Sequence, residues 1–247
     1  MASARCDLSI VIPAFNETAR LPGTLAALAR ARRRWPWSIE VLLVDDGSTD
    51  DTVAAAQAQL PELRILRQRR RTGAGAAMRR GALAAGGQRV LLCDADGAVD
   101  FMALRRLWRC LDAGCDIALG SRAGAANWLG GGAPLHRRLA SLAWRRLSAA
   151  ALAAAPEDLQ CGFKLFSRRA VRSIFPQLRC SSFAIYAEIV ARAQGQGLSI
   201  GAVAVPWQPM PGSQVRLWRD APWMAAELWR LRRRGPGDPL YPVVTFG

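Results

Sequence analysis

The sequence has almost no lysine and almost no histidine. Lys164 is the only lysine among 247 residues, so arginine supplies nearly all of the 34 cationic side chains, and His136 is the only histidine. The formal net charge of +15 favours an anionic partner, such as nucleic acid, a phospholipid surface or a phosphorylated substrate. The alternative explanation is solubility together with a GC-rich codon bias, which also favours arginine over lysine.

Zinc sites and membrane spans are not predicted. One histidine is too few for a zinc site, and none of the six cysteines forms a Cys-x-x-Cys pair, so we expect reduced thiols in a cytosolic protein. Arginines interrupt every apolar run that approaches about 18 residues, which argues against a transmembrane helix. The first residues, MASARCDLSIVIP, have no apolar segment before the first strand and are not expected to be a signal peptide.

The order of the segments predicts an α/β fold. Apolar segments that predict buried strands alternate with segments whose apolar residues have helical spacing. Strands are predicted at 8–14, 38–46, 63–68, 88–96 and 115–122, and helices at 17–34, 48–60, 73–86 and 100–111. This alternation predicts a mostly parallel sheet flanked by helices, with its ligand at the carboxyl ends of the strands.

The pattern changes after residue 122. We expect a Gly-rich loop at 123–134, a long helix at 135–152, a short strand leading into a helix at 158–171 and a further helix at 182–197. A last strand is predicted at 198–207, followed by a Trp- and Arg-rich amphipathic helix at 217–234 and an irregular tail. No internal repeat is present.

Two carboxylates leave the fourth predicted strand one residue apart. Asp94 and Asp96 flank Ala95 in LLCDADGA, and residues i and i+2 of an extended segment point the same way. Two carboxylates on one side can hold a hard cation such as Mg²⁺ or Mn²⁺, which in turn can bridge diphosphate oxygens. The alternative is a turn with acidic caps.

Other predicted strand ends also carry polar or aromatic residues. In VDDGSTD, Asp46 can accept a hydrogen bond from a base imide or a ribose hydroxyl, although such acids also serve as helix caps. In VIPAFNE, Pro13 and Glu17 flank Phe15, whose ring can stack near a base. Because these ends meet at one edge of the sheet, they predict a single site.

These motifs resemble a known family. IVIPAFNE, LVDDGSTDDT, GAGAAMRRG, LLCDADGA, LGSR and DLQCGFKLF, in this order and spacing, are similar to family 2 glycosyltransferases of the GT-A (Rossmann-like) fold. Within that family they most resemble polyprenyl- and dolichyl-phosphate sugar transferases, in particular the dolichyl-phosphate β-glucosyltransferase branch. The resemblance implies a glycosyltransferase domain at 7–217, with a nucleotide-sugar half at 7–122 and an acceptor half at 123–217, before an amphipathic helix and tail at 218–247.

The resemblance also implies an activity and a set of site residues. The activity is inverting transfer of a hexose, with glucose as the first candidate, from a UDP-sugar or other nucleotide sugar to a polyprenyl phosphate. The nucleotide sugar is expected at Pro13, Phe15, Glu17, Asp46, Arg79, Asp94 and Ala95, and the Mg²⁺ or Mn²⁺ ion at Asp94 and Asp96. The catalytic residues are expected to be Asp96 and Asp158, and the acceptor is expected at Arg122, Arg137, Arg138, Gln160, Lys164 and Glu188.

The role of Asp158 has two interpretations. It is expected to act as a general base or as a group that positions the acceptor, and a phosphate acceptor needs little base catalysis because it is already an anion. The alternative for Gln160, Cys161 and Phe163 is a buried strand beneath the site, and Lys164 can instead be a solvated strand-end charge.

The sequence departs from the family pattern at several basic positions. The family's Gly-Lys-Gly is Gly73-Ala74-Gly75, where Arg71 or Arg79 can reach the same space, and its Gly-Ser-Lys is Gly212-Ser213-Gln214. The membrane anchors usual in this branch are not expected from these residues. The Arg-rich 135–152 and Trp-rich 217–234 segments therefore predict peripheral binding to an anionic membrane surface on its cytoplasmic face, with ordinary packing on the sheet as the alternative.

Three other functions are weighed against this one. The first is a family 2 enzyme with a soluble sugar, glycan or metabolite as acceptor. The second, a nucleotidyltransferase, is disfavoured because no basic Gly-rich loop follows the first strand. The third is a nucleic-acid-binding protein without enzyme activity, but the arginines are scattered and no reading motif is present, so nucleic acid is not an expected partner.

Overall fold

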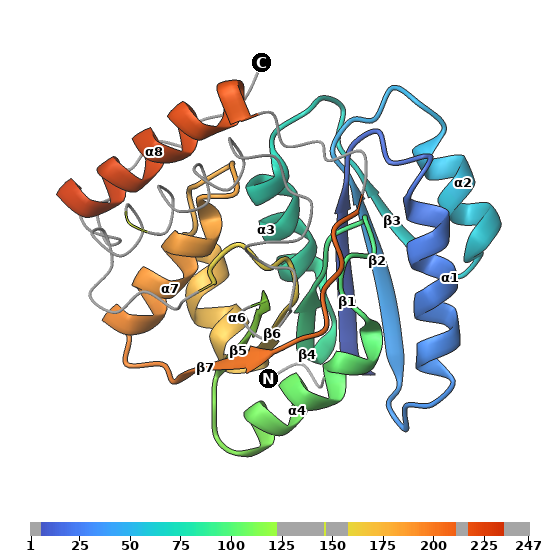
Figure 1. Ribbon diagram of the computed structural model, residues 1–247, viewed down its shortest axis with the longest axis horizontal. Helices are drawn as coiled ribbons and strands as arrows, with labels where there is room; N and C mark the ends of the chain where they lie inside the picture. The colour runs from blue at the N-terminus through green and yellow to red at the C-terminus, as the bar shows by residue number, and fades with distance from the viewer. Residues whose placement is uncertain (1–5, 123–145, 147–157, 211–216, 235–247) are drawn as a thin grey trace.

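A seven-stranded sheet forms the centre of the computed structural model, and helices cover both of its faces (Figure 1). The structure describes residues 6–122, 146, 158–210 and 217–234. The strands are β1 Cys6–Ala14, β2 Ile39–Asp45, β3 Arg64–Arg67, β4 Gly87–Leu92, β5 Ile117–Ser121, β6 Lys164–Ser167 and β7 Ile200–Ala204. The α-helices are α1 Leu21–Arg32, α2 Thr52–Gln59, α3 Ala74–Ala84, α4 Leu104–Asp112, α6 Arg168–Ile174, α7 Ile185–Gly195 and α8 Leu217–Arg234, with short 3-10 helices η1 Phe101–Ala103 and η3 Phe175–Gln177.

The strand order is β3-β2-β1-β4-β6-β5-β7. All neighbours are parallel except β6, which runs antiparallel to both β4 and β5. The chain goes from β1 outward to β2 and β3 and then returns to place β4 on the other side of β1. Ligands of open α/β sheets bind where the strand order reverses in this way, so the crevice between the carboxyl ends of β1 and β4 is the expected site.

The central strands β1, β2 and β4 are mostly apolar because helices cover both faces of the sheet. On one face, Val11 and Val90 pack with α3, α6, α7 and α8, and on the other face Ile10 and Leu91 pack with α1, α2 and α4. Fully burying one such aliphatic side chain contributes about 1.5–3 kcal/mol relative to leaving it exposed. The two apolar layers therefore stabilise the sheet and fix which edge carries the polar strand ends.

Helix α3 lies unusually close to the sheet. A Cβ atom on Gly81 would lie 2.3 Å from Val11 Cγ1 and 2.7 Å from Val44 Cγ2, so only glycine permits this approach. The helix begins after Gly73, whose φ of 104° is strained for residues with a side chain. The close approach brings the start of α3 to the carboxyl ends of β1 and β2.

The C-terminal helix α8 packs onto this domain. Met224 and Leu228 belong to the same apolar core as α3 and α7. The buried Glu227 carboxylate accepts hydrogen bonds from Ser181 N at 3.1 Å and from Ser182 Oγ. The division of the chain at residue 217 stays a prediction, as does the helix at 135–152, which apart from Arg146 lies outside the described residues.

Over the ranges that the structure describes, no helix combines the length and the apolar character needed to cross a bilayer.

Candidate active site

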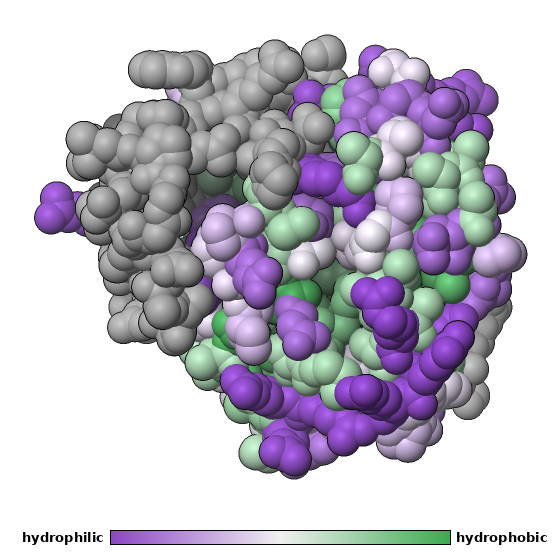
Figure 2. Space-filling model, turned by 45° about the vertical axis from the view of Figure 1, so that its right-hand side comes forward, coloured by the Kyte–Doolittle hydropathy of each residue, from purple (hydrophilic) through white to green (hydrophobic). Residues whose placement is uncertain are grey.

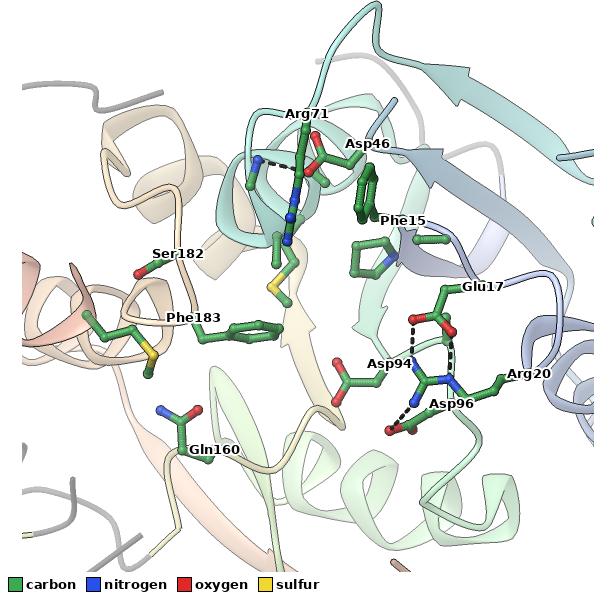
Figure 3. Close-up of a pocket in the computed structure, with 18 of the residues that line it drawn as sticks. Phe15, Glu17, Arg20, Asp46, Arg71, Asp94, Asp96, Gln160, Ser182 and Phe183 are labelled. Carbon is green, nitrogen blue, oxygen red and sulfur yellow. Dashed lines mark hydrogen bonds and ion pairs between the residues drawn. The ribbon is translucent and has the colours of Figure 1, made fainter. Parts of the chain in front are cut away.

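A pocket of about 290 Å³ opens at the carboxyl ends of β1, β2 and β4 (Figure 3). Its size lies at the lower end of the range for small-molecule sites, about 300–1,000 Å³. The residues that line it are Pro13, Ala14, Phe15, Glu17, Arg20, Asp46, Arg71, Gly73, Ala74, Ala77, Met78, Asp94, Ala95, Asp96, Arg122, Gln160, Ser182, Phe183 and Met224. The strand ends that the sequence predicts to form one site therefore do meet.

Asp94 and Asp96 both line this pocket. The loop that carries them is held by α1, because Thr24 Oγ1 donates a hydrogen bond of 2.7 Å to the carbonyl oxygen of Ala95. Asp94 also depends on Gly162, since a Cβ atom there would lie 1.8 Å from Asp94 Oδ2. Burial, and next the negative charge of Asp96, raise the pKa of Asp94 to about 6.

The residues present fit a hard divalent cation. Within the described residues no cluster of three or more His, Cys, Asp or Glu side chains is able to hold a metal. Two adjacent carboxylates leave several positions of an octahedral Mg²⁺ or Mn²⁺ ion to water and to substrate oxygens, which is how such ions bind with phosphate ligands. A bound cation would also relieve the repulsion between the negative charges of Asp94 and Asp96.

Asp46 lies in the pocket but is engaged by the loop before α3. Its carboxylate accepts hydrogen bonds from Thr72 N at 2.7 Å, Gly73 N at 2.8 Å and Gln68 Nε2 at 2.8 Å. Burial raises the pKa of Asp46, although the hydrogen bonds from Thr72 and Gly73 and the charge of Arg71 lower it. The residue therefore shapes the pocket wall, and Phe15 lies beside it in Figure 3.

Of the two arginines expected near the position of the family lysine, Arg71 lines the pocket and Arg79 does not. The Arg71 guanidinium lies in the pocket, 4.3 Å from the centre of the Phe15 ring. Arg79 is directed away from the pocket. Its Nε donates a hydrogen bond of 3.0 Å to the carbonyl oxygen of Phe175, and its Nη2 donates one of 3.2 Å to the carbonyl oxygen of Pro176. The expectation that Arg79 faces the nucleotide sugar is therefore corrected: it fastens α3 to η3.

Asp158 is paired with Arg122 at the edge of the pocket. Arg122 Nε and Nη2 donate hydrogen bonds of 2.7 Å each to the two carboxylate oxygens, and Arg122 N donates a third of 2.9 Å. Burial alone would raise the pKa of Asp158, but the hydrogen bonds and charge of Arg122 bring it below its ordinary value. Because Arg122 and Gln160 line the pocket and Asp158 lies behind them, the geometry favours positioning of Arg122 over general-base action.

Two further expected acceptor residues lie inside the protein. Lys164 is fully buried, donates to the carbonyl oxygen of Cys161 and lies 3.4 Å from the centre of the Tyr186 ring, and burial lowers its pKa to about 8. Glu188 is also fully buried and accepts from Cys180 N at 2.7 Å and Arg192 Nε at 2.9 Å. Both placements correct the expectation of direct acceptor contact. Arg137 and Arg138 lie outside the described residues.

The structure adds pocket residues that the sequence analysis missed. They come from the start of α1, from α3, from the loop before α7 and from α8, and they are Arg20, Met78, Ser182, Phe183 and Met224. Only Arg20 had a local signal, since it follows Glu17 by three residues and ion pairs at this spacing are common around helix starts. The others depend on contacts between segments far apart in the sequence.

A mostly parallel sheet with an acidic pair and several arginines at its switch point is suited to an enzyme that binds a phosphate-bearing ligand together with a divalent cation. The family model for glycosyl transferase family 2 matches residues 9–175, so the chain belongs to that family. The family expected from the motifs is thereby confirmed, and the chain is a glycosyltransferase.

Curated relatives cover most of the chain. It is 30% identical to the dolichyl-phosphate beta-glucosyltransferase of Dictyostelium discoideum over 92% of this chain and 74% of that protein. It is 34% identical to the Drosophila melanogaster enzyme of the same name, over 86% of this chain and 70% of the other. For the human enzyme of that name the identity is 32%, over 85% and 69% respectively.

Solved structures share the fold. Glucosyl-3-phosphoglycerate synthase from Mycobacterium tuberculosis in complex with phosphoglyceric acid superposes with a TM-score of 0.71 at 21% identity, covering 96% of this chain and 82% of that one. The same enzyme with Mn²⁺, UDP-glucose and phosphoglyceric acid gives a TM-score of 0.70 at 20% identity, with the same coverage. This likeness confirms the mostly parallel α/β architecture.

Proposed function

We propose that this glycosyltransferase transfers glucose from UDP-glucose to a polyprenyl phosphate with inversion, using Mg²⁺ or Mn²⁺. The observation that carries the proposal is one pocket lined both by the carboxylates of Asp94 and Asp96 and by the arginines Arg20, Arg71 and Arg122. The shared name of the relatives, at 30–34% identity over most of the chain, supports glucose and a dolichyl-type phosphate.

The donor end of the pocket is built from β1, β2 and β4. Phe15 offers a face to the nucleoside, and Asp46 holds the loop that carries Arg71. Asp94 and Asp96 would hold the cation, which when bound supplies charge neutralisation for the departing nucleoside diphosphate. Arg71 adds a guanidinium at the same end, and a guanidinium can donate to two oxygens of a phosphate.

The acceptor end is assigned to Arg122 and the apolar residues beyond it. Arg122, held by Asp158, would orient the acceptor phosphate, one oxygen of which forms the bond to the anomeric carbon as the bond to the nucleoside diphosphate breaks. Attack from the side opposite the leaving group inverts the anomeric centre. Because the acceptor oxygen is already an anion, Asp158 need not remove a proton, which agrees with its lowered pKa.

An apolar wall supports a lipid acceptor over a soluble one. Met78, Phe183 and Met224 line the same pocket, and Phe183 faces its interior in Figure 3. Such a wall suits the first isoprene unit of a polyprenyl phosphate better than the hydroxyl groups of a sugar. Peripheral binding at the cytoplasmic face of a membrane, through the net charge and α8, would bring the lipid to the pocket.

The test is transfer from radiolabelled UDP- and GDP-sugars to a short polyprenyl phosphate with Mg²⁺ or Mn²⁺, with the label followed into the organic phase. The expected result is metal-dependent lipid label from UDP-glucose. Nucleotide release without lipid label would keep the transferase and replace the acceptor by a soluble one. No release from any donor would contradict the proposal.

The metal role has its own variant. Asp96→Ala is expected to keep the fold, as judged by circular dichroism, and to lower metal-dependent transfer at least about a hundredfold, because one of the two carboxylate ligands is lost. Transfer at the wild-type rate in this variant would refute the role assigned to Asp96.

A further inference from the structure

Arg20 lies between two carboxylates at the acidic end of the pocket (Figure 3). Its Nε donates a hydrogen bond of 2.7 Å to Glu17 Oε2, its Nη2 contacts Glu17 Oε1, and its Nη1 lies 3.9 Å from Asp96 Oδ2. The side chain of Arg20 is 15% exposed and that of Glu17 is 8% exposed, so water screens this pair less than a surface pair. The guanidinium therefore contributes a positive charge directly beside an expected metal ligand.

The main chain keeps this guanidinium in place. Arg20 immediately precedes α1, and the backbone N–H groups of Arg20 and Leu21 donate to the carbonyl oxygen of Glu17 at 3.0 and 2.9 Å. One turn further on, Thr24 holds the loop of Asp94 and Asp96. The start of α1 and the acidic loop are thus one connected unit, in which Glu17 holds the guanidinium by two contacts and Asp96 by one longer contact.

A divalent cation and the Arg20 guanidinium are both positively charged groups that the Asp96 carboxylate can bind. Both are attracted to the same carboxylate, and they repel each other. If a cation bound Asp96, the two contacts with Glu17 would still hold the guanidinium at the pocket wall, and Nη1 would be released. A guanidinium in that position can donate to the oxygens of a diphosphate that the same cation binds.

We propose that Arg20 competes with the divalent cation for Asp96 in the empty pocket and binds the donor diphosphate in the loaded pocket, so that it couples metal binding to nucleotide binding. This assignment rests on the proposed function for the identity of the donor. The coupling is reciprocal: if UDP strengthens Mn²⁺ binding by some factor, Mn²⁺ strengthens UDP binding by the same factor. Arg20 is then a positioning residue for Asp96 and a ligand of the donor.

The experiment measures Mn²⁺ affinity without and with UDP, by the electron paramagnetic resonance signal of free Mn²⁺. In the wild type, UDP is expected to strengthen Mn²⁺ binding, by a factor within the range of about 5–150 that is usual for coupled sites. In Arg20→Gln, Mn²⁺ alone should bind at least about fivefold more tightly and the strengthening by UDP should shrink at least about fivefold. The control is Arg32→Gln at the other end of α1, outside the pocket. It breaks the ion pair between Arg32 and Glu62 and should leave both values unchanged.

Each result decides the assignment. Arg20→Gln with wild-type affinity for Mn²⁺ alone, or with wild-type strengthening by UDP, overturns it, provided that circular dichroism shows the variant folded. If Arg20→Gln does not fold, Arg20→Lys replaces it. In this variant the affinity for Mn²⁺ without UDP should equal that of the wild type, and UDP should strengthen Mn²⁺ binding less than in the wild type. Wild-type strengthening by UDP would overturn the assignment. Wild-type protein that couples Mn²⁺ and UDP but labels no lipid keeps the role of Arg20 and removes the lipid acceptor.

Discussion

Asp94 has room for its carboxylate because residue 162 has no side chain. A Cβ atom at this position would overlap the carboxylate, with 1.8 Å to Oδ2 and 2.1 Å to Cγ. Gly162 lies directly against the Asp94 carboxylate, so this glycine contributes to the site without any chemistry of its own. The motif in which this glycine stands therefore has a steric explanation in addition to the family resemblance.

Gly162→Ala is expected to displace Asp94 and to weaken Mn²⁺ binding in the presence of UDP at least about tenfold, because one of two carboxylate ligands leaves its position. Titration of free Mn²⁺ by electron paramagnetic resonance measures the effect. Gly195→Ala is the matched control, since nothing lies within 4 Å of a Cβ atom there. Equal Mn²⁺ affinity in Gly162→Ala and Gly195→Ala would show that Asp94 is not a ligand.

Asp158 should stabilise the fold above acid pH. Its pKa is below the ordinary value of 3.8 in the folded chain, so the stabilisation is fully present above pH 3.8 and is lost as the pH falls through the lower folded value. Asp158→Asn should lower the free energy of unfolding by about 1–3 kcal/mol at pH 7, because Arg122 loses a charged partner, and by less at pH 3. Urea unfolding at both pH values checks this.

The control for Asp158 is Asp112→Asn, which breaks the more exposed pair with Arg89 and should cost less than about 1 kcal/mol. A loss at pH 3 as large as at pH 7 would contradict the ionic explanation. In the transfer assay, Asp158→Asn should keep donor affinity and slow transfer, since Arg122 is the group it positions. Unchanged transfer would remove Asp158 from the mechanism.

At the scale of the elements, the contact of α3 with the sheet determines the shape of the donor end. Gly81 lies against Val11 of β1 and Val44 of β2, and the start of the same helix forms the pocket wall at Gly73 and Ala74. A change in the distance between α3 and the sheet would therefore move the pocket wall as well as the core.

Gly81→Ala is expected to destabilise the protein by about 1–3 kcal/mol, as overpacking of a core does, although alanine is the better helix former. Gly23→Ala in α1 has nothing within 4 Å of the added Cβ atom and should raise stability by up to about 1 kcal/mol. Urea unfolding of the two variants compares them directly. An unchanged or raised stability of Gly81→Ala would contradict the close packing of α3.

The elements also show what the sequence could predict. The described strands and α-helices from β1 to α8 were predicted because their apolar periodicity is a local property of the chain. The insertion of β6 antiparallel between β4 and β5 was not, since it pairs Leu165 with Leu91 and Ala118, far away in the sequence. Long-range pairing of this kind leaves no local signal.

The sequence predicted the site residues whose position follows from the direction of a strand, and it failed for residues whose position depends on long-range packing. Residues at strand ends, such as Phe15, Asp94 and Asp96, face the pocket as expected because the strand direction places them there. Residue type alone does not tell whether a charged side chain faces the pocket or the core, which is why Lys164 and Glu188 were misplaced. Charged residues are seldom fully buried, and both are exceptions because they have partners.

At the scale of the whole molecule, positive charge is spread widely. On the face in Figure 2, hydrophilic residues gather along the right-hand and lower rim, and the middle is a mixture of hydrophilic, pale and hydrophobic residues. The net charge of +15 creates a field that attracts anionic surfaces from a distance. On α8, Trp229 is 57% exposed, and tryptophan favours the interface of a membrane.

The protein is therefore expected to float with vesicles containing phosphatidylglycerol at low salt and to dissociate as salt rises, because the Debye length falls from about 30 Å at 0.01 M to about 8 Å at 0.15 M. Vesicles of phosphatidylcholine alone should not bind it. Trp229→Ala should weaken flotation, whereas Leu83→Ala, an exposed apolar side chain on α3, should not. Absence of binding at low salt would remove the membrane proposal.

The buried position of the only lysine has a practical consequence. Amine-reactive reagents such as succinimidyl esters modify lysine side chains that meet solvent, and the ammonium of Lys164 is fully buried between Cys161 and the ring of Tyr186. A lysine-directed label therefore reaches the side chain of Lys164 only when the region around β6 opens. The rate at which Lys164 is labelled, followed by mass spectrometry, therefore measures how often the region around β6 opens.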